Sequence, residues 1–116
     1  MADTGFREAV LLGSEYNEGA LLENAVFIEL LRRGYDVCVG SYKDKEVDFT
    51  SWRDGEPEFY QVALSLADGE VLRRELSSLK RLDAVRKTVI TMDRDLPDMP
   101  DGIQAVSAVD FFLGNE

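Results

Sequence analysis

Glu23 is the first residue of this chain whose type and position could do chemistry, because it stands among apolar residues of a helical segment. Segment 19–33 has the periodicity of a helix, and a glycine follows it. At about 100° per residue, Val26, Phe27 and Leu30 cluster around the direction of this carboxylate. Burying an unpaired carboxylate is costly, so we expect a cation, a metal ion or a hydrogen-bond donor to face Glu23.

Asp48 and Gln61 are the two further polar residues that the pattern brings together. Asp54 and Gly55 lie between two alternating runs, and this dipeptide is the strongest short-range sign of a β-hairpin. A two-residue turn sets Asp48 opposite Gln61 on one face of the sheet, whereas a longer turn through Pro57 would shift this register. A helix-borne carboxylate facing a hairpin-borne one offers the oxygen ligands that a hard cation such as Mg²⁺ prefers.

Each of these three residues can also be interpreted as having a purely structural role. In this interpretation Glu23 lies near a helix N-terminus, where the helix dipole and a backbone N–H stabilise a carboxylate. Asp48 shares its strand face with Glu46 and Thr50, which is also typical of a hydrated sheet face. Gln61 is better placed as a hydrogen-bond partner of Asp48 or Glu23 than as a metal ligand. For Glu23 and Asp48 both interpretations stay open.

The elements that must position these residues follow from the spacing of apolar and turn residues. Residues 1–17 are interpreted as a linker or docking arm, and 18–116 as one domain. After the helix 19–33, alternation and apolar runs predict strands over 35–42, 46–52, 58–64, 87–92 and 103–106. Asp68 is expected to cap a helix that extends to about Val85, and Ser107 a closing helix. The order αβββαββα predicts an α/β fold with a mixed sheet.

The bulk composition is that of a globular chain, and it excludes several kinds of site. A chain of 116 residues with 45% apolar and 31% charged residues can bury one core. It has no apolar run of membrane-spanning length, no signal-peptide pattern and a single cysteine, so we expect a cytoplasmic protein without a membrane partner. The absence of histidine excludes Ser-His and Cys-His nucleophiles and His-ligated zinc. A net charge of −10 argues against nucleic acid as a tight partner of this chain alone.

A family resemblance runs in order along nearly the whole chain, through GALLEN (19–24), ELLRRGYDV (29–37), KEVDF (45–49), YQVALSL (60–66), TVITMD (88–93) and the ending 102–113. These segments resemble the C-terminal domain of a large prokaryotic family of AAA-type ATPases. In that family the domain is nuclease-like, of unknown function, and follows an ATP-binding domain. The resemblance implies a restriction-endonuclease-like core of the PD-(D/E)XK type. It also implies that the ATPase part is missing here, since the chain has no GxxxxGK[ST] loop.

The candidate site departs from the pattern of active nucleases of this type, which carry E-x-K or D-x-K on the third strand. Gln61 stands in place of the second acidic ligand, and Ala63 in place of the lysine expected to orient or activate the attacking water. Losing such a group commonly lowers the rate by roughly 10²–10⁴-fold. Lys45 is the nearby candidate for a migrated lysine, but the hairpin register sets it on the opposite sheet face from Asp48.

The sequence therefore predicts a non-catalytic domain with a degenerate site at Glu23, Asp48 and Gln61, and with no cofactor. We expect it to bind a protein partner or to associate with itself, tethered to an AAA-type ATPase domain. The alternative is a Mg²⁺-dependent nuclease of DNA or RNA, in which the same three residues hold the metal and a lysine or arginine reaches them from elsewhere. A weaker alternative is a nucleic-acid-binding domain without catalysis.

Overall fold

The computed structural model describes residues 15–40, 47–82 and 86–115. Its elements are α2 (Glu15–Arg32), β1 (Asp36–Val39), β2 (Phe49–Arg53), β3 (Glu56–Ala63), α3 (Gly69–Lys80), β4 (Arg86–Thr91), β5 (Ile103–Ser107) and α4 (Ala108–Leu113). This is the predicted order of one helix, three strands, one helix, two strands and a closing helix. Ser107 is the predicted cap of α4, because its hydroxyl oxygen accepts from the N–H of Asp110 at 3.2 Å.

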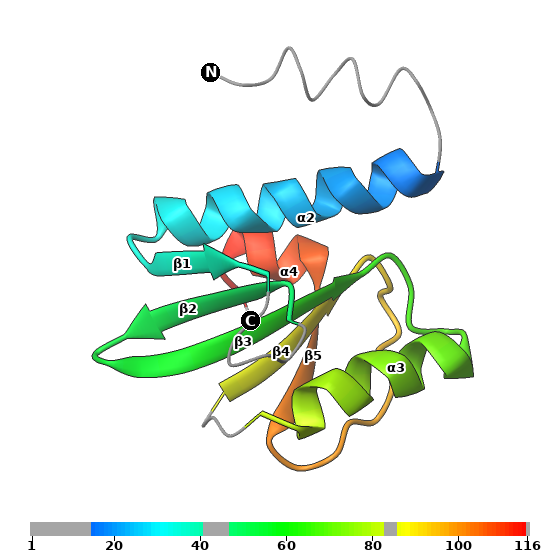
Figure 1. The fold of residues 1–116 in the computed structure, drawn as a ribbon. Helices are drawn as coiled ribbons and strands as arrows, with labels where there is room; N and C mark the ends of the chain where they lie inside the picture. Colours follow the sequence, from blue (N-terminus) through cyan, green and yellow to red (C-terminus); the bar gives the residue numbers. More distant parts are fainter. Residues whose placement is uncertain (1–14, 41–46, 83–85, 116) are drawn as a thin grey trace.

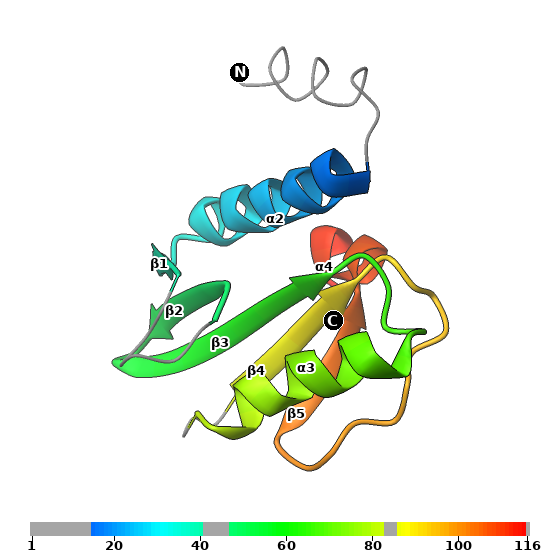
Figure 2. The same cartoon turned by 45° about the vertical axis from the view of Figure 1, so that its right-hand side comes forward.

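The five strands form one mixed sheet in the order β1-β2-β3-β4-β5. The pairs β1–β2 and β2–β3 are antiparallel, whereas β3–β4 and β4–β5 are parallel. Helices α2 and α4 cover one face of the sheet, and α3 covers the other (Figures 1 and 2). Because α3 connects the parallel strands β3 and β4, it has to cross over a face of the sheet. The predicted α/β fold with a mixed sheet is confirmed.

The hairpin between β2 and β3 has the predicted two-residue turn. Asp54 and Gly55 have φ angles of 55° and 82°. Positive φ at both central residues is what a type I′ turn requires, and Asp and Gly adopt it more readily than most residues. The turn pairs Arg53 with Glu56 and thereby fixes the register of the whole hairpin.

Strand β2 begins at Phe49 rather than at the predicted 46, and just before it side chains take over the pairing with β3. Asp48 lies one position beyond the ladder, opposite Gln61 as predicted. The N–H of Asp48 donates to Oε1 of Gln61 at 2.6 Å, and Oδ2 of Asp48 accepts from the N–H of Val62 at 2.8 Å. Residues 41–46, which include Lys45 and the predicted ends of two strands, lie outside the described residues.

Helix α3 has the predicted cap but ends earlier than predicted. Oδ1 of Asp68 accepts from the backbone N–H two residues on, at 2.8 Å. The helix ends at Lys80 rather than at about Val85, which itself lies outside the described residues. Nζ of Lys87 donates to the carbonyl oxygens of Leu79 and the residue three further on, at 3.1 and 2.9 Å. These contacts satisfy terminal carbonyl groups without a further turn.

Helix α2 begins at Glu15, inside the segment predicted as a linker or docking arm; residues 1–14 of that segment lie outside the described residues. Gly34 follows the helix with a φ of 87°, the left-handed conformation that commonly ends a helix. Within the described parts of the chain, no helix combines the length and the apolar character needed to cross a membrane.

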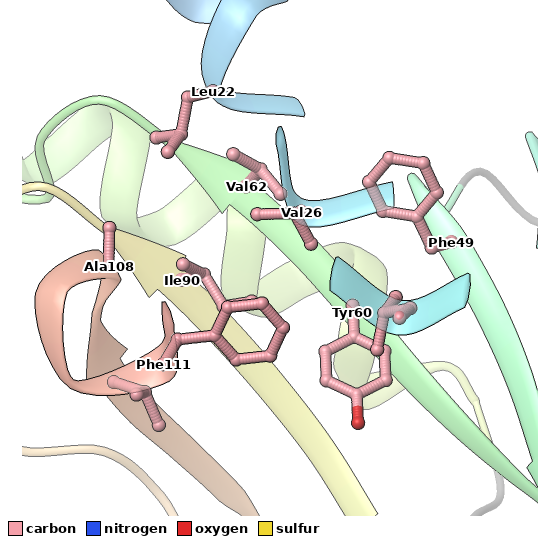
Figure 3. Packing of buried hydrophobic residues seen from close by; sticks show 10 residues of the cluster. Leu22, Val26, Phe49, Tyr60, Val62, Ile90, Ala108 and Phe111 are labelled. Carbon is pink, nitrogen blue, oxygen red and sulfur yellow. The ribbon is translucent and has the colours of Figure 1, made fainter. Parts of the chain in front are cut away.

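Two apolar clusters hold the helices to the sheet. The cluster under α2 and α4, shown in Figure 3, consists of Leu22, Val26, Leu30, Phe49, Tyr60, Val62, Ile90, Val106, Ala108 and Phe111. The cluster under α3 consists of Val47, Phe59, Leu66, Leu79, Leu82, Val89 and Ile103. Side chains along β3 alternate between the two clusters. Gln61 lies between Tyr60 and Val62 of the first cluster, so its side chain is on the α3 face.

Candidate functional site

A pocket of about 440 Å³ opens where α2, α3 and the start of β2 meet, and we call it the acidic pocket. Its lining consists of Glu23, Gly40, Val47, Asp48, Gln61, Val62, Arg74, Glu75 and Ser78. The three residues of the predicted site therefore lie around one pocket. Helix α3 adds a third carboxylate and an arginine that the sequence analysis did not assign to the site.

Glu23 lines the acidic pocket from the edge of the buried face of α2, not from its centre as the periodicity predicted. The buried face is centred on Leu22, Val26 and Leu30. Glu23 itself is exposed, and its direction differs by roughly 60° from that of Val26, at the centre of the buried face. The buried carboxylate of this helix is Glu29, which is 8% exposed. Helix α2 begins well before Glu23, so this residue lies beyond the first turn of the helix. The helix dipole stabilises a carboxylate within the first turn, and it therefore does not account for Glu23.

Gln61 is hydrogen-bonded through both ends of its amide. Its Oε1 accepts from the N–H of Asp48 at 2.6 Å, and its Nε2 donates to Oε1 of Glu75 at 2.9 Å. The reversed amide would set its NH₂ group against an N–H donor, so this network determines the orientation. The bonds match the interpretation of Gln61 as a hydrogen-bond partner. Its carboxylate partner is Glu75, however, rather than Glu23.

Asp48 is held in the pocket by the backbone of the neighbouring strand. Oδ2 accepts from the N–H of Val62 at 2.8 Å, while Oδ1 has no hydrogen-bond partner among the described residues. The residue therefore replaces one bond of the sheet ladder and keeps one carboxylate oxygen for a ligand or for water. The interpretation as an ordinary hydrated sheet face does not describe this arrangement, because the carboxylate is part of the strand pairing.

Glu75 is the site residue that sequence reasoning missed. It is 8% exposed and lies on the sheet-facing side of α3, beside the partly buried Leu72 and the buried Leu79. It follows Leu72 by three residues and precedes Leu79 by four, which is the spacing of one helix face. The spacing of apolar residues therefore marks Glu75 as a carboxylate on a buried helix face more directly than it marks Glu23.

The three carboxyl groups of the acidic pocket all have raised pKa values, and burial is the main cause in each case. Burial raises the pKa of Asp48, although the hydrogen bond from the Val62 N–H opposes the change. The pKa values of Glu75 and Glu23 are raised first by burial and then by the negative charge of Asp48. Glu23 is exposed as a residue, so only partial burial of its carboxyl group acts there. Clustered perturbed carboxylates are typical of sites that bind a cation or exchange protons.

Arg74 is the one basic side chain among the described residues that line the acidic pocket. Its Nη2 lies 3.9 Å from Oε2 of Glu75, and its side chain is 72% exposed. Such an ion pair is long and solvated, so it compensates the carboxylates weakly. Ala63 packs against the apolar cluster under α3. Lys45 lies outside the described residues.

The donor atoms of the acidic pocket are those that a hard cation prefers, but they do not meet at one point. In the part of the chain that the structure describes, no group of three His, Cys, Asp or Glu side chains could hold a metal ion. The amide of Gln61 engages Oε1 of Glu75, whereas it bonds no carboxylate oxygen of Glu23 or Asp48. The pocket can therefore attract a cation electrostatically without offering it a converged set of ligands.

The chain is similar to a longer protein. The chain is 35% identical over 113 residues, 97% of its own length, to an uncharacterized protein of Haemophilus influenzae. The match spans only 28% of that longer protein. No family model matches the sequence. No solved structure matches it either.

Proposed function

We propose that this chain is a non-catalytic domain with a PD-(D/E)XK-like core, belonging to a longer protein with an AAA-type ATPase domain and serving protein interaction or self-association. The element order and the mixed sheet with helices on both faces support this core. A carboxylate on the first helix and another at the start of the hairpin, around one pocket, support it further. Because the relative is a longer protein, it is compatible with such a tether.

The observation that carries the non-catalytic half of the proposal is the use of Gln61 within the fold. Both ends of its amide are occupied by protein groups, the N–H of Asp48 and the carboxylate of Glu75. To ligate a metal ion through Oε1, the residue would have to share the oxygen with a 2.6 Å hydrogen bond or break that bond. With Ala63 packed against apolar residues, the strand also offers no cation to activate water.

The experiment is a titration of Mn²⁺ into the full chain, read by calorimetry, together with cleavage assays on DNA and RNA. The comparison uses the wild type, Asp48→Ala and the control Asp98→Ala, which removes an exposed aspartate outside the pocket. We expect no cleavage, and any weak Mn²⁺ uptake by this acidic chain should be equal in the two variants. Mn²⁺-dependent cleavage that Asp48→Ala abolishes and Asp98→Ala retains would overturn the proposal.

A metal-dependent nuclease is the second candidate, and two residues of α3 favour it. Glu75 supplies a carboxylate where the strand lacks one, and Arg74 supplies a cation at the pocket. In this reading Arg74 takes the part of the missing lysine. The Mn²⁺ experiment distinguishes the candidates if Arg74→Gln is added, because the nuclease requires cleavage activity that this variant loses.

The interaction half of the proposal is supported by an apolar groove of about 570 Å³ between α2, the end of β3 and α4. Its lining is apolar except for one residue and consists of Glu18, Leu21, Leu22, Ala25, Leu64, Met92 and Phe112. Met92 is 52% exposed there. Exposed apolar surface of this kind is typical of protein contacts.

Self-association through this groove predicts a mass that rises with protein concentration in light scattering after size exclusion. Met92→Asp should keep the protein monomeric, whereas the control Leu96→Asp, at a comparably exposed residue outside the groove, should not. If the wild-type chain stays monomeric at every concentration, self-association through the groove is excluded. Binding to another polypeptide then remains as the proposed interaction.

A further inference from the structure

A second polar pocket, of about 210 Å³, lies on the α2 face of the sheet near the start of β4 and β5. Its lining consists of Arg33, Tyr35, Arg53, Tyr60, Arg86, Thr88 and Gln104, and we call it the arginine pocket. Three of these residues are arginines, and none of the described residues that line it is acidic. This is unexpected in a chain whose net charge is −10. A concave basic surface in an acidic protein concentrates positive potential locally.

The buried Glu58 holds two of the arginines at the pocket. It is 7% exposed, and its Oε2 lies 3.0 Å from Nη2 of Arg53 and 3.7 Å from Nε of Arg86. One carboxylate thus faces two guanidinium groups, which leaves a positive charge uncompensated within this triad. The contact of Arg86 is longer than a hydrogen bond and its side chain is 50% exposed, so its N–H donors are available to another acceptor.

Arg33 forms a rigid wall of the pocket. Its Nε donates to Oε2 of Glu29 at 2.8 Å, and its Nη2 donates to the carbonyl oxygen of Phe111 at 2.6 Å. The guanidinium carbon also lies 4.4 Å from the centroid of the Phe111 ring. Because these contacts hold the cation in place before any ligand arrives, little side-chain freedom is lost on binding.

The floor of the arginine pocket carries neutral hydrogen-bonding groups. Tyr60, Thr88 and Gln104 stand side by side on neighbouring strands. Nε2 of Gln104 donates to Oγ1 of Thr88 at 3.2 Å, so the Thr88 hydroxyl keeps its own hydrogen for another acceptor. The Tyr60 hydroxyl donates to Oε1 of Glu58 at 3.4 Å, and burial raises the pKa of this phenol well above its usual range, which keeps it protonated. Donors therefore surround the space on several sides.

From these groups we propose that the arginine pocket binds the phosphate group of a small phosphorylated compound. Planar guanidinium groups bind the oxygens of a phosphate through paired, charge-assisted hydrogen bonds. A volume of about 210 Å³ is below the roughly 300–1,000 Å³ of pockets for drug-sized ligands, so it suits one anionic group with a small substituent. An extended polyanion such as nucleic acid fits less well, because the rest of the chain is acidic.

The test is a titration of the isotope-labelled full chain, at low salt, with inorganic phosphate, with a nucleoside monophosphate and with a single-stranded oligonucleotide. Amide chemical shifts identify where each probe binds. We expect phosphate and the monophosphate to shift the amide signals around Arg86, Thr88 and Gln104. Arg86→Gln should weaken the affinity for phosphate by roughly 10- to 100-fold, the range for losing a hydrogen bond to a charged group.

The matched control is Arg94→Gln, which removes the same charge at an exposed residue outside the pocket and should leave the affinity unchanged. Gln104→Glu is the second variant: it changes an exposed residue, so the fold should tolerate it, and it sets a negative charge in the pocket that should abolish binding. The proposal is overturned if phosphate shifts no signals at this pocket, or if the Arg86 and Arg94 variants lose affinity equally. Binding of the oligonucleotide alone would overturn it in favour of a nucleic-acid contact.

Discussion

Beside the arginine pocket, Glu58 faces Arg53 and Arg86 at 3.0 and 3.7 Å, whereas in the acidic pocket the cation that the structure describes beside Glu75 is Arg74, at 3.9 Å. The two pockets thus hold buried carboxylates under opposite conditions on opposite faces of one sheet. Removing a carboxylate from water costs free energy, and the attraction of nearby cations can offset this cost. Among the residues that the structure describes, cations outnumber carboxylates at the arginine pocket, and carboxylates outnumber cations at the acidic pocket.

The pKa values of Glu29 and Glu75 change in opposite directions. Hydrogen bonds from Arg32, and to a smaller extent from Arg33, lower the pKa of Glu29, which lies behind the arginine pocket. Burial and the charge of Asp48 raise the pKa of Glu75. Glu29 therefore stabilises the fold in its charged form, while Glu75 costs stability when charged. Stability lost at a cluster of polar side chains is typical of a binding or catalytic site, or of what remains of one.

The largest expected effect is at the paired carboxylate behind the arginine pocket. Glu29→Ala removes one partner of Arg33, a partly buried cation that also packs on Phe111, and should lower the free energy of unfolding by about 2 kcal/mol. The exposed Arg32 regains water and adds little to the loss. Chemical denaturation at neutral pH measures this value. Glu18→Ala, at an exposed glutamate of the same helix, should change it by less than about 0.5 kcal/mol, and equal losses would contradict the comparison.

A smaller effect is expected when Asp48 is changed in two ways. Asp48→Ala leaves the N–H of Val62 without its acceptor and should cost about 1 kcal/mol. Asp48→Asn keeps an acceptor oxygen and removes the charge that raises the pKa of Glu75, so it should cost less or stabilise the fold. Denaturation of the two variants side by side measures the difference. If Asn costs as much as Ala, the charge of Asp48 is stabilising, and the contrast between the pockets fails.

The smallest expected effect is a dependence on pH with opposite sign at the two carboxylates. A raised pKa means that folded Glu75 holds its proton more tightly than the unfolded chain does. Protonated Glu75 therefore contributes its full stabilisation of the fold below the ordinary carboxyl pKa of 4.5. This stabilisation is lost as the pH rises through the raised pKa. Glu29 has a lowered pKa, so its charged form stabilises the fold above the ordinary carboxyl pKa. This stabilisation is lost as the pH falls through the lowered pKa.

Thermal unfolding from about pH 4 to about pH 8 measures both signs. At neutral pH, Glu75→Gln should raise Tm by a few degrees, because a glutamine oxygen can still accept from Nε2 of Gln61. Glu29→Gln should lower Tm at neutral pH. Both differences should shrink toward acidic pH. A Tm of Glu75→Gln below that of the wild type at neutral pH would show that the charge of Glu75 is paired more strongly than Arg74 allows.

Much of the fold was predictable because its signals are local. The two-residue turn at Asp54 and Gly55 needed only residues that accept positive φ, and the caps at Asp68 and Ser107 needed only a side-chain acceptor next to free N–H groups. The end of α3 was not predictable in this way. Carbonyl groups at this end accept hydrogen bonds from Lys87, a residue of the next strand, and no local pattern specifies such a contact.

The candidate site was predictable only in part. The hairpin register brought Asp48 and Gln61 together because side-chain alternation in a strand has a fixed period. Glu23 was assigned to the centre of a buried face, since periodicity gives directions around a helix but not where the sheet lies. Glu75 was not predicted as a site residue although it occupies an apolar position of its helix. It stands next to Arg74 in a strongly charged segment, which makes the apolar spacing hard to recognise.

The sequence by itself determined which elements form, in which order, and which residues of the hairpin stand opposite each other, because turns, caps and alternation act over a few neighbouring residues. Only the tertiary structure decided which charges meet. Glu58 with Arg86 and Gln61 with Glu75 are brought together by the packing of strands and helices that lie far apart in the chain. The energy of a charge depends on distance and burial, which no local pattern specifies.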